Sequence, residues 1–133
     1  MIDTSALVAG LVADHVHHDL ARLELRRGLR IPAIVMAETF AVLRRAFGQT
    51  AAGAESLLHP WSADVDAVLP TTAHAVRATF GRAAELDLGG SIHDAIVAQV
   101  CIQHDVPLVT LDTRQHQLAL ALGARSRYLL TGR

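Results

Sequence analysis

Residues 91–112 read SIHDAIVAQVCIQHDVPLVTLD and predict a helix, a buried strand and the start of a second helix, in that order. From Ser91 to His104, apolar residues recur at the spacing of one helix face. Pro107–Leu111 is a short apolar run typical of a buried strand, and Asp112 follows it at a helix start. A buried strand between two helices indicates an α/β protein with a mainly parallel sheet.

The same alternation of elements continues in both directions along the chain. Helices are expected at Ser5–Leu11, Asp14–Gly28, Ile34–Phe47, Thr50–Leu58, Thr72–Leu86 and Thr113–Leu122. Short extended segments are expected at Ile2–Thr4, Leu29–Ala33, Asp64–Leu69 and Arg127–Leu130. Pro60 is expected to end the fourth of these helices. A chain of 133 residues fits one domain, so residues 1–133 are expected to form a single α/β sandwich.

The composition excludes several classes of protein. The chain has 12 arginines and no lysine, so it is neither a P-loop NTPase nor a Schiff-base enzyme. No apolar run is long enough to cross a bilayer, and the start, Met1-Ile2-Asp3, lacks the basic residues of a signal peptide. Cys101 is the only cysteine and lies in an apolar stretch, which suggests a buried thiol in a reducing cytoplasm. The net charge of −1 means that any nucleic-acid contact must come from a local patch.

Four acidic residues need explanation. Asp3, Asp94 and Asp112 lie at helix starts, where each has a plain structural role as an N-cap, and Ser91-x-x-Asp94 resembles a capping box. Glu38 differs, because its neighbours three and four residues away are all apolar. A carboxylate on an apolar helix face is costly unless it is protonated, paired or bound to a metal. A buried pair between Glu38 and an arginine is the structural alternative.

The four acids together suggest a site. In an α/β sheet, the ends of the strands and the starts of the following helices gather at the edge where ligands bind. Four carboxylates at that edge would repel one another unless cations neutralise them. Oxygen ligands suit Mg²⁺ or Mn²⁺, and sites with one or two such ions carry out phosphoryl displacement. The sequence therefore predicts a divalent-metal site at Asp3, Glu38, Asp94 and Asp112.

These residues lie in segments that resemble a known family. The segments are Met1-Ile2-Asp3-Thr4-Ser5-Ala6-Leu7, Met36-Ala37-Glu38, His93-Asp94-Ala95-Ile96-Val97-Ala98 and Leu108-Val109-Thr110-Leu111-Asp112. In this order and spacing, over nearly the whole chain, they resemble the four motifs of PIN-domain nucleases. The similarity is greatest to the VapC-type ribonuclease toxins of type II toxin–antitoxin systems. The resemblance implies a PIN-like α/β/α sandwich with a short, mainly parallel central sheet.

The resemblance also implies roles for individual residues. It makes Asp3, Glu38, Asp94 and Asp112 the catalytic, metal-binding acids. Ser5 and Thr110 match helper hydroxyls that assist substrate or phosphate binding. The last motif departs from the pattern, because many members carry a further acid and then an aromatic residue where this chain has Arg114 and Gln115. Arg114 is expected to approach a phosphate instead, and the number of ions, one or two, stays open.

The implied function is that of a metal-dependent endoribonuclease that cleaves RNA with a metal-activated water. The resemblance further implies a toxin with a small cognate antitoxin and a homodimer, and the lack of long apolar runs predicts no association with a membrane. Three alternatives remain: a nuclease that acts on DNA, a degenerate PIN domain that only binds RNA or protein, and a haloacid-dehalogenase-like phosphatase. The last is disfavoured, because Asp3-Thr4-Ser5 lacks the second aspartate and the chain lacks the helper lysine. The residues do not choose the target RNA.

Two groups of basic side chains have less specific patterns. Arg22, Arg26 and Arg30 repeat every four residues, which fits contact with phosphate or an acidic partner as well as a solvated helix face. The histidines of the segment His15-Val16-His17-His18 lack the cysteines and spacing of a zinc finger. They are interpreted as a polar surface turn.

Overall fold

The structure is a computed structural model that describes residues 1–130. Its helices are α1 (Thr4–Leu11), α2 (His18–Leu25), α3 (Ala33–Phe47), α4 (Ala51–Ser62), α5 (Ala73–Leu86), α6 (Ile92–Gln103) and α7 (Thr113–Ala121). Its strands are β1 (Ile31–Pro32), β2 (Val68–Leu69), β3 (Leu108–Thr110) and β4 (Ser126–Tyr128). Short strands thus alternate with helices, as the sequence predicts.

The strands pair in parallel around the N-terminal segment. β1 pairs with β2, and β3 pairs with β4, both in parallel. Ile2 forms a parallel bridge with Val109, and its backbone N–H donates a hydrogen bond to the carbonyl of Arg30 beside β1. The N-terminal segment therefore links the two pairs in the order β2, β1, N-terminal segment, β3, β4.

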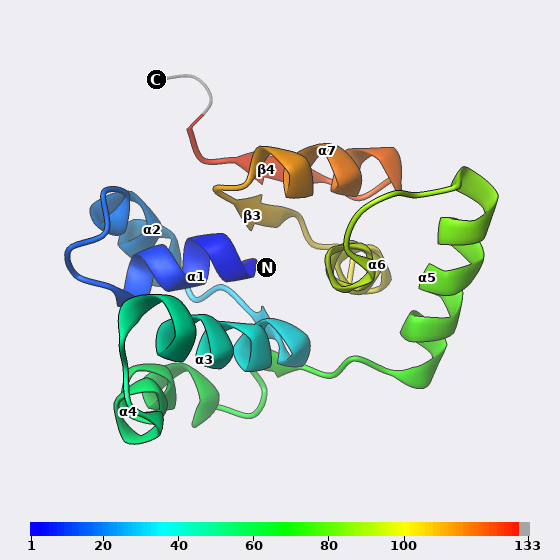
Figure 1. The fold of residues 1–133 in the computed structure, drawn as a ribbon. Coiled ribbons are helices and arrows are strands. Elements are labelled where there is room, and N and C mark those ends of the chain that lie inside the picture. The colour runs from blue at the N-terminus through cyan, green and yellow to red at the C-terminus, as the bar shows by residue number, and fades with distance from the viewer. Residues whose placement is uncertain (131–133) are drawn as a thin grey trace.

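The helices cover this small sheet in two groups. Figure 1 shows α1–α4 gathered on one side of the strands and α5–α7 curving around the other side. Within the groups, α1 packs on α2 and α3, α3 on α4, and α6 on both α5 and α7. Ile2, Leu7, Val35, Val100 and Leu108 are fully buried in the core between them. The predicted α/β/α sandwich with a short parallel sheet is confirmed. Within residues 1–130, no helix has the length and apolar character that crossing a membrane requires.

Two predicted elements near the N-terminus are shorter than expected. The strand at Ile2–Thr4 is reduced to the bridge at Ile2, because Asp3 caps a helix that already begins at Thr4. The helix predicted from Asp14 begins only at His18. The chain turns before it, where the N–H of His15 bonds to the carbonyl of Val12 and the N–H of His18 bonds to that of His15.

The prediction for Pro60 is wrong. Helix α4 continues past this proline to Ser62: Pro60 lacks the N–H for its own helical hydrogen bond, but the bonding resumes beyond it, where the N–H of Ala63 donates to the carbonyl of His59 at 3.0 Å. The following strand is shorter than predicted because a turn occupies its start. There the N–H of Ala67 donates to the carbonyl of Asp64, and the N–H of Asp66 donates to the Asp64 carboxylate. The last strand is Ser126–Tyr128 rather than Arg127–Leu130.

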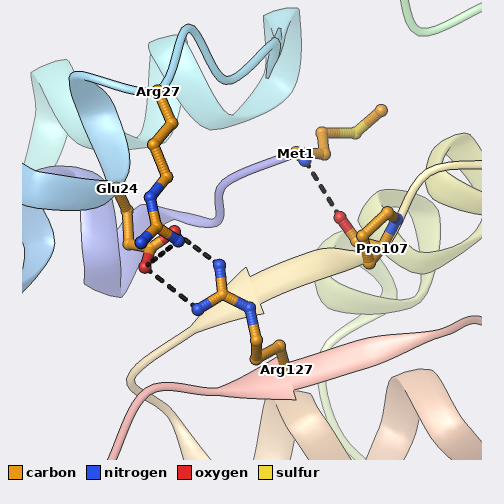
Figure 2. Close-up of polar contacts among 5 residues, drawn as sticks. All are labelled: Met1, Glu24, Arg27, Pro107 and Arg127. Carbon is orange, nitrogen blue, oxygen red and sulfur yellow. Dashed lines mark hydrogen bonds and ion pairs between the residues drawn. The ribbon is translucent and has the colours of Figure 1, made fainter.

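An ion pair with a buried carboxylate connects distant parts of the chain (Figure 2). Glu24 of α2, whose side chain is 5% exposed, accepts hydrogen bonds from Arg127 of β4 at 3.0 and 2.5 Å. Arg27 donates a further bond to it at 3.3 Å. These bonds favour the charged carboxylate, and Arg127 lowers the pKa of Glu24. The α-amino group of Met1 donates to the carbonyl of Pro107 at 2.9 Å, which holds the N-terminal segment against the start of β3.

Candidate metal centre

Asp3 is fixed at the start of α1 by three donors. Its Oδ1 accepts hydrogen bonds from the backbone N–H of Ala6 at 3.0 Å and from the hydroxyl of Ser5 at 2.8 Å. The hydroxyl of Thr110 donates to Oδ2. Asp3 is therefore the N-cap that its position in the sequence suggests, but the same buried carboxylate also lines a cavity.

Burial dominates the electrostatics of Asp3. The side chain is almost completely removed from water, which raises the pKa of its carboxyl to about 6. The hydrogen bonds from Thr110, Ala6 and Ser5 act in the opposite direction and favour the carboxylate. An ionised Asp3 at neutral pH thus gains from a nearby positive charge.

Ser5 and Thr110 connect Asp3 to the end of β3. Besides its bond to Asp3, the Ser5 oxygen accepts the N–H of Leu111 at 3.1 Å. The Thr110 oxygen accepts the N–H of Asp112 at 2.9 Å and lies 3.3 Å from the Ser5 oxygen. Thr110 thus bonds to two of the acids and Ser5 to one of them, and the fully buried Thr110 does not line the cavity.

Glu38 lies in the second turn of α3 and has an unsatisfied oxygen. Its Oε2 is 3.4 Å from the hydroxyl of Thr4. Its Oε1 is buried and has no hydrogen-bond partner among the residues that the structure describes. The arginine pair considered from the sequence is absent from the ion pairs of residues 1–130. Because an unpartnered buried carboxylate oxygen is costly, this atom fits a cation ligand.

Asp94 lies in the first turn of α6 and faces the other acids. The capping box suggested by the sequence does not form, because the Ser91 side chain makes no capping hydrogen bond. Burial raises the pKa of the Asp94 carboxyl, and the charges of Glu38 and Asp112 raise it further. The structure therefore brings Asp94 into electrostatic contact with acids from two other elements.

Asp112 caps α7 and marks the point where the last motif departs from the family pattern. Its Oδ1 accepts the N–H groups of Arg114 at 2.9 Å and Gln115 at 3.4 Å. The Arg114 side chain is exposed and does not line the cavity. Gln115 is buried, and its Nε2 donates to the carbonyl of Asp94 at 3.1 Å. Gln115 thus supports the start of α6, and the residue in the position of the fifth acid lies outside the cavity.

One cavity of about 440 Å³ unites the predicted acids. Its lining consists of Asp3, Thr4, Ser5, Val8, His15, His17, Glu38, Val42, Asp94, Val97, Leu111 and Asp112. In the described part of the chain, no three acidic, histidine or cysteine side chains form a ready-made metal cluster. The four carboxylates therefore surround a shared space without a preformed coordination sphere.

His15 and His17 line this cavity, which the sequence does not predict. Their sequence pattern predicts a polar surface turn, and they do lie in a turn between α1 and α2. Their place at the cavity depends on how this turn folds back beside α1. No local pattern in the sequence contains that information.

Comparison with known proteins agrees with this geometry. The family described as the PIN domain matches residues 1–120. The chain is 33% identical over 115 residues to Ribonuclease VapC40 of two Mycobacterium tuberculosis strains, CDC 1551 / Oshkosh and ATCC 25618 / H37Rv. This alignment covers 84% of the chain and 85% of the relative.

Solved structures show the same fold at low sequence identity. One is M. tuberculosis VapC20, a sarcin–ricin-loop-cleaving toxin, with a TM-score of 0.73, 19% identity and coverage of 92% of this chain and 94% of that one. Another is FitAcB from Neisseria gonorrhoeae, with a TM-score of 0.68, 15% identity and coverage of 98% and 97%. The resemblance seen in the sequence is confirmed.

Proposed function

The chain belongs to the PIN-domain family, and on this basis we propose that it is a divalent-metal-dependent endoribonuclease. The observation that carries the proposal is the convergence of Asp3, Glu38, Asp94 and Asp112 on one cavity. A surface that only bound RNA or protein would have no need of four carboxylates there. The ribonuclease VapC40 relatives support RNA as the substrate.

The residues present fit a divalent cation. All four acids offer oxygen atoms, which suits Mg²⁺ or Mn²⁺ rather than zinc or copper. The unpartnered Oε1 of Glu38 and the raised pKa values of Asp3 and Asp94 both indicate a site that gains from positive charge. A bound ion would supply Lewis-acid activation of water and neutralise charge at the phosphate.

The protein's own part is to hold the carboxylates in place. Ser5 and Thr110 orient Asp3, and the N-cap bonds at the start of α7 orient Asp112. Glu38 and Asp94 have no comparable hydrogen-bond restraints on their carboxylates within the described residues, and we assign their free oxygens both to contact with the cation and to hydrogen bonds from the attacking water. Four acids are available for one or two ions, because Arg114 stands at the position where many family members carry a fifth acid.

The wider assignment follows the same family. We propose that residues 1–133 form a single domain that acts in the cytoplasm as the toxin of a toxin–antitoxin pair. Its partners would be a small cognate antitoxin and a second copy of the chain. Single-stranded or looped RNA is the expected substrate, because its backbone and bases are more accessible than those of a duplex.

A cleavage assay tests this proposal. Wild-type protein and Asp94→Asn are incubated with single-stranded RNA and, in parallel, single-stranded DNA, in Mg²⁺, Mn²⁺ or EDTA. We expect RNA cleavage only with metal, and a loss of about a hundredfold or more in the variant, because a group that organises transition-state charge is removed. Mn²⁺ should also raise the Tm of the wild type more than that of Asp94→Asn.

The exposed acid Asp66 provides a control outside the cavity. Asp66→Asn should cleave RNA as the wild type does. Equal cleavage in EDTA and in metal would overturn the mechanism. Faster cleavage of DNA than of RNA would overturn the substrate assignment.

A further inference from the structure

Two imidazole rings share the cavity with the four acids. His15 and His17 come from the turn between α1 and α2 and line the same space as Asp3 and Glu38. Both side chains are half-buried. The pair therefore belongs to the wall of the cavity rather than to an outer loop.

The geometry of the turn defines the chemistry of His15. The backbone N–H of His17 donates a hydrogen bond to Nδ1 of His15 at 3.1 Å. This bond requires a lone pair on Nδ1, so the ring carries its proton on Nε2 and offers an N–H donor while neutral. The bonds from His15 N–H to Val12 and from His18 N–H to His15 hold the backbone of the turn.

The two rings lie beside each other and have unused nitrogens. Their centroids are 5.9 Å apart and their planes are inclined by 47°. Across residues 1–130, Nε2 of His15 and both ring nitrogens of His17 have no hydrogen-bond partner in the protein. Two imidazole rings in the wall of the cavity, one of them oriented by the bond to its Nδ1, are therefore available to a ligand.

The cavity has a specific need for such donors. Its charged side chains are all carboxylates, which repel the phosphates of RNA. The hydroxyls of Thr4 and Ser5 are engaged with Glu38 and Asp3. Among the described side chains that line the cavity, only His15 and His17 carry nitrogen donors. Arg114, the residue expected from the sequence to reach phosphate, lies outside it.

His18 differs from its two neighbours. Its Nδ1 lies 2.9 Å from the carbonyl oxygen of Ala9, so one ring nitrogen is used within the protein. It lines a separate hollow with Arg22 and Trp61. The contrast shows that the fold directs two of the three histidines, and not the third, toward the acids.

We propose that His15 and His17 form the substrate-binding wall of the cleavage site and donate hydrogen bonds to phosphate and ribose oxygens of RNA beside the scissile bond. This inference rests on the proposed ribonuclease function and adds the residues that hold the substrate. The acids would carry the catalytic step, whereas the histidines would set the affinity for the sugar–phosphate backbone of RNA.

Steady-state cleavage of single-stranded RNA separates the two roles. We expect His15→Ala and His17→Ala each to raise KM about tenfold or more, because a hydrogen bond to a charged phosphate is lost. Their kcat should stay within about threefold of the wild type, because the acids are untouched. His15→Gln should recover most of the affinity, since its side-chain amide offers an N–H donor near the position of Nε2.

A second measurement removes cleavage from the comparison. In the Asp94→Asn background, fluorescence anisotropy with labelled single-stranded RNA should show the same rise in Kd for the two alanine variants. His74→Ala is the matched control, because it removes an exposed imidazole of α5 that does not line the cavity. Its KM and Kd should equal those of the parent protein.

The outcomes distinguish the inference from the function on which it rests. If the wild type cleaves RNA and the His15 and His17 variants behave like His74→Ala, the inference is wrong and the nuclease stands. If the wild type binds RNA through His15 but cleaves none, the inference stands as RNA binding and the nuclease is wrong. If the wild type neither cleaves nor binds RNA, both are wrong.

Discussion

At Asp3, a helix cap and a place in the cavity coincide in one carboxylate. The sequence sets the N-cap against the metal site as alternatives, and the structure shows the cap and places the same group in the cavity. The cap and the cavity position are compatible because the capping N–H of Ala6 bonds to Oδ1, whereas the other oxygen, Oδ2, is oriented by the hydroxyl of Thr110. Asp112 combines a cap and a cavity position in the same way. A capping position thus does not argue against a role in catalysis.

Thr110→Val tests whether this positioning matters. The change keeps the size of the side chain but removes the hydroxyl that donates to Asp3 and accepts from Asp112. We expect kcat/KM for RNA cleavage to fall about ten- to hundredfold, as for other residues that orient metal-binding groups. Thr110→Ser, which keeps the hydroxyl, should retain most of the activity.

Thr79 provides a control for lost stability. It is equally buried, and its hydroxyl donates to the carbonyl of Ala75 within α5, away from the cavity. Thr79→Val should lower the Tm without lowering kcat/KM. A similar loss of kcat/KM in both valine variants would show that Thr110 acts only through stability.

At the scale of elements, helix α2 and the turn before it depend on close packing with α1. Gly10 lies opposite Leu25, and a Cβ at Gly10 would come within 2.4 Å of the Leu25 Cδ1. The absence of a side chain at Gly10 therefore lets α2 approach α1 closely. This contact helps to place the turn that carries His15 and His17.

Gly10→Ala should disturb this contact. The added methyl group overpacks the interface, and we expect the free energy of unfolding to fall by about 1–3 kcal/mol. Denaturant unfolding measures the change. In Gly81→Ala, a Cβ would meet nothing within 4 Å on α5, so the better helix propensity of alanine should raise the free energy of unfolding by about 0.5–1 kcal/mol. Equal changes in the free energy of unfolding of the two variants would contradict the inference that Gly10 is needed for close packing of α1 on α2.

At the scale of the whole molecule, the ion pair between Glu24 and Arg127 joins α2 to β4, 103 residues apart in the sequence. Both oxygens of the nearly buried carboxylate are bonded, and the pKa of Glu24 is lowered by Arg127. A carboxyl with a lowered pKa stabilises the fold when it is charged. That contribution is present above the pKa of the unfolded chain and is lost as the pH falls through the lowered value.

Glu24→Gln should therefore destabilise the protein in a pH-dependent way. At pH 7 we expect the free energy of unfolding to fall by about 1–3 kcal/mol, because Arg127 and Arg27 lose a charged partner. The difference in the free energy of unfolding between variant and wild type should decrease as the pH falls below about 4.3, the ordinary pKa of a glutamate. Denaturant unfolding at several pH values measures both effects.

Glu85 offers a matched control in an exposed pair with Arg82. Glu85→Gln should change the free energy of unfolding by less than about 0.5 kcal/mol. If the difference in the free energy of unfolding between Glu24→Gln and the wild type stays constant from pH 7 to pH 3, the charge of Glu24 is not the cause of the destabilisation.

Sequence patterns predict the features of this protein that depend on local physics. Helical periodicity and short apolar strands indicate the parallel α/β sandwich, and the positions of Asp3, Asp94 and Asp112 at helix starts indicate one sheet edge. Glu38 is recognisable because a carboxylate on an apolar face is costly wherever it occurs. Element ends are predicted less well. Helix α4 passes Pro60 because the loss of this one N–H donor does not stop the helical bonding beyond it, and α2 starts late at His18 because hydrogen-bonded turns precede it.

By itself, then, the sequence determined the class of fold and singled out the four acids as candidate ligands, since periodicity, capping and the cost of a misplaced charge act over a few residues. Only the tertiary structure decided which side chains share the cavity with them. The placement of His15 and His17 in its wall and of Arg114 outside it follows from the packing of α1, α2 and α7. The pairing of Arg127 with Glu24 rather than Glu38 is likewise a long-range contact. Such contacts join residues that no local pattern links.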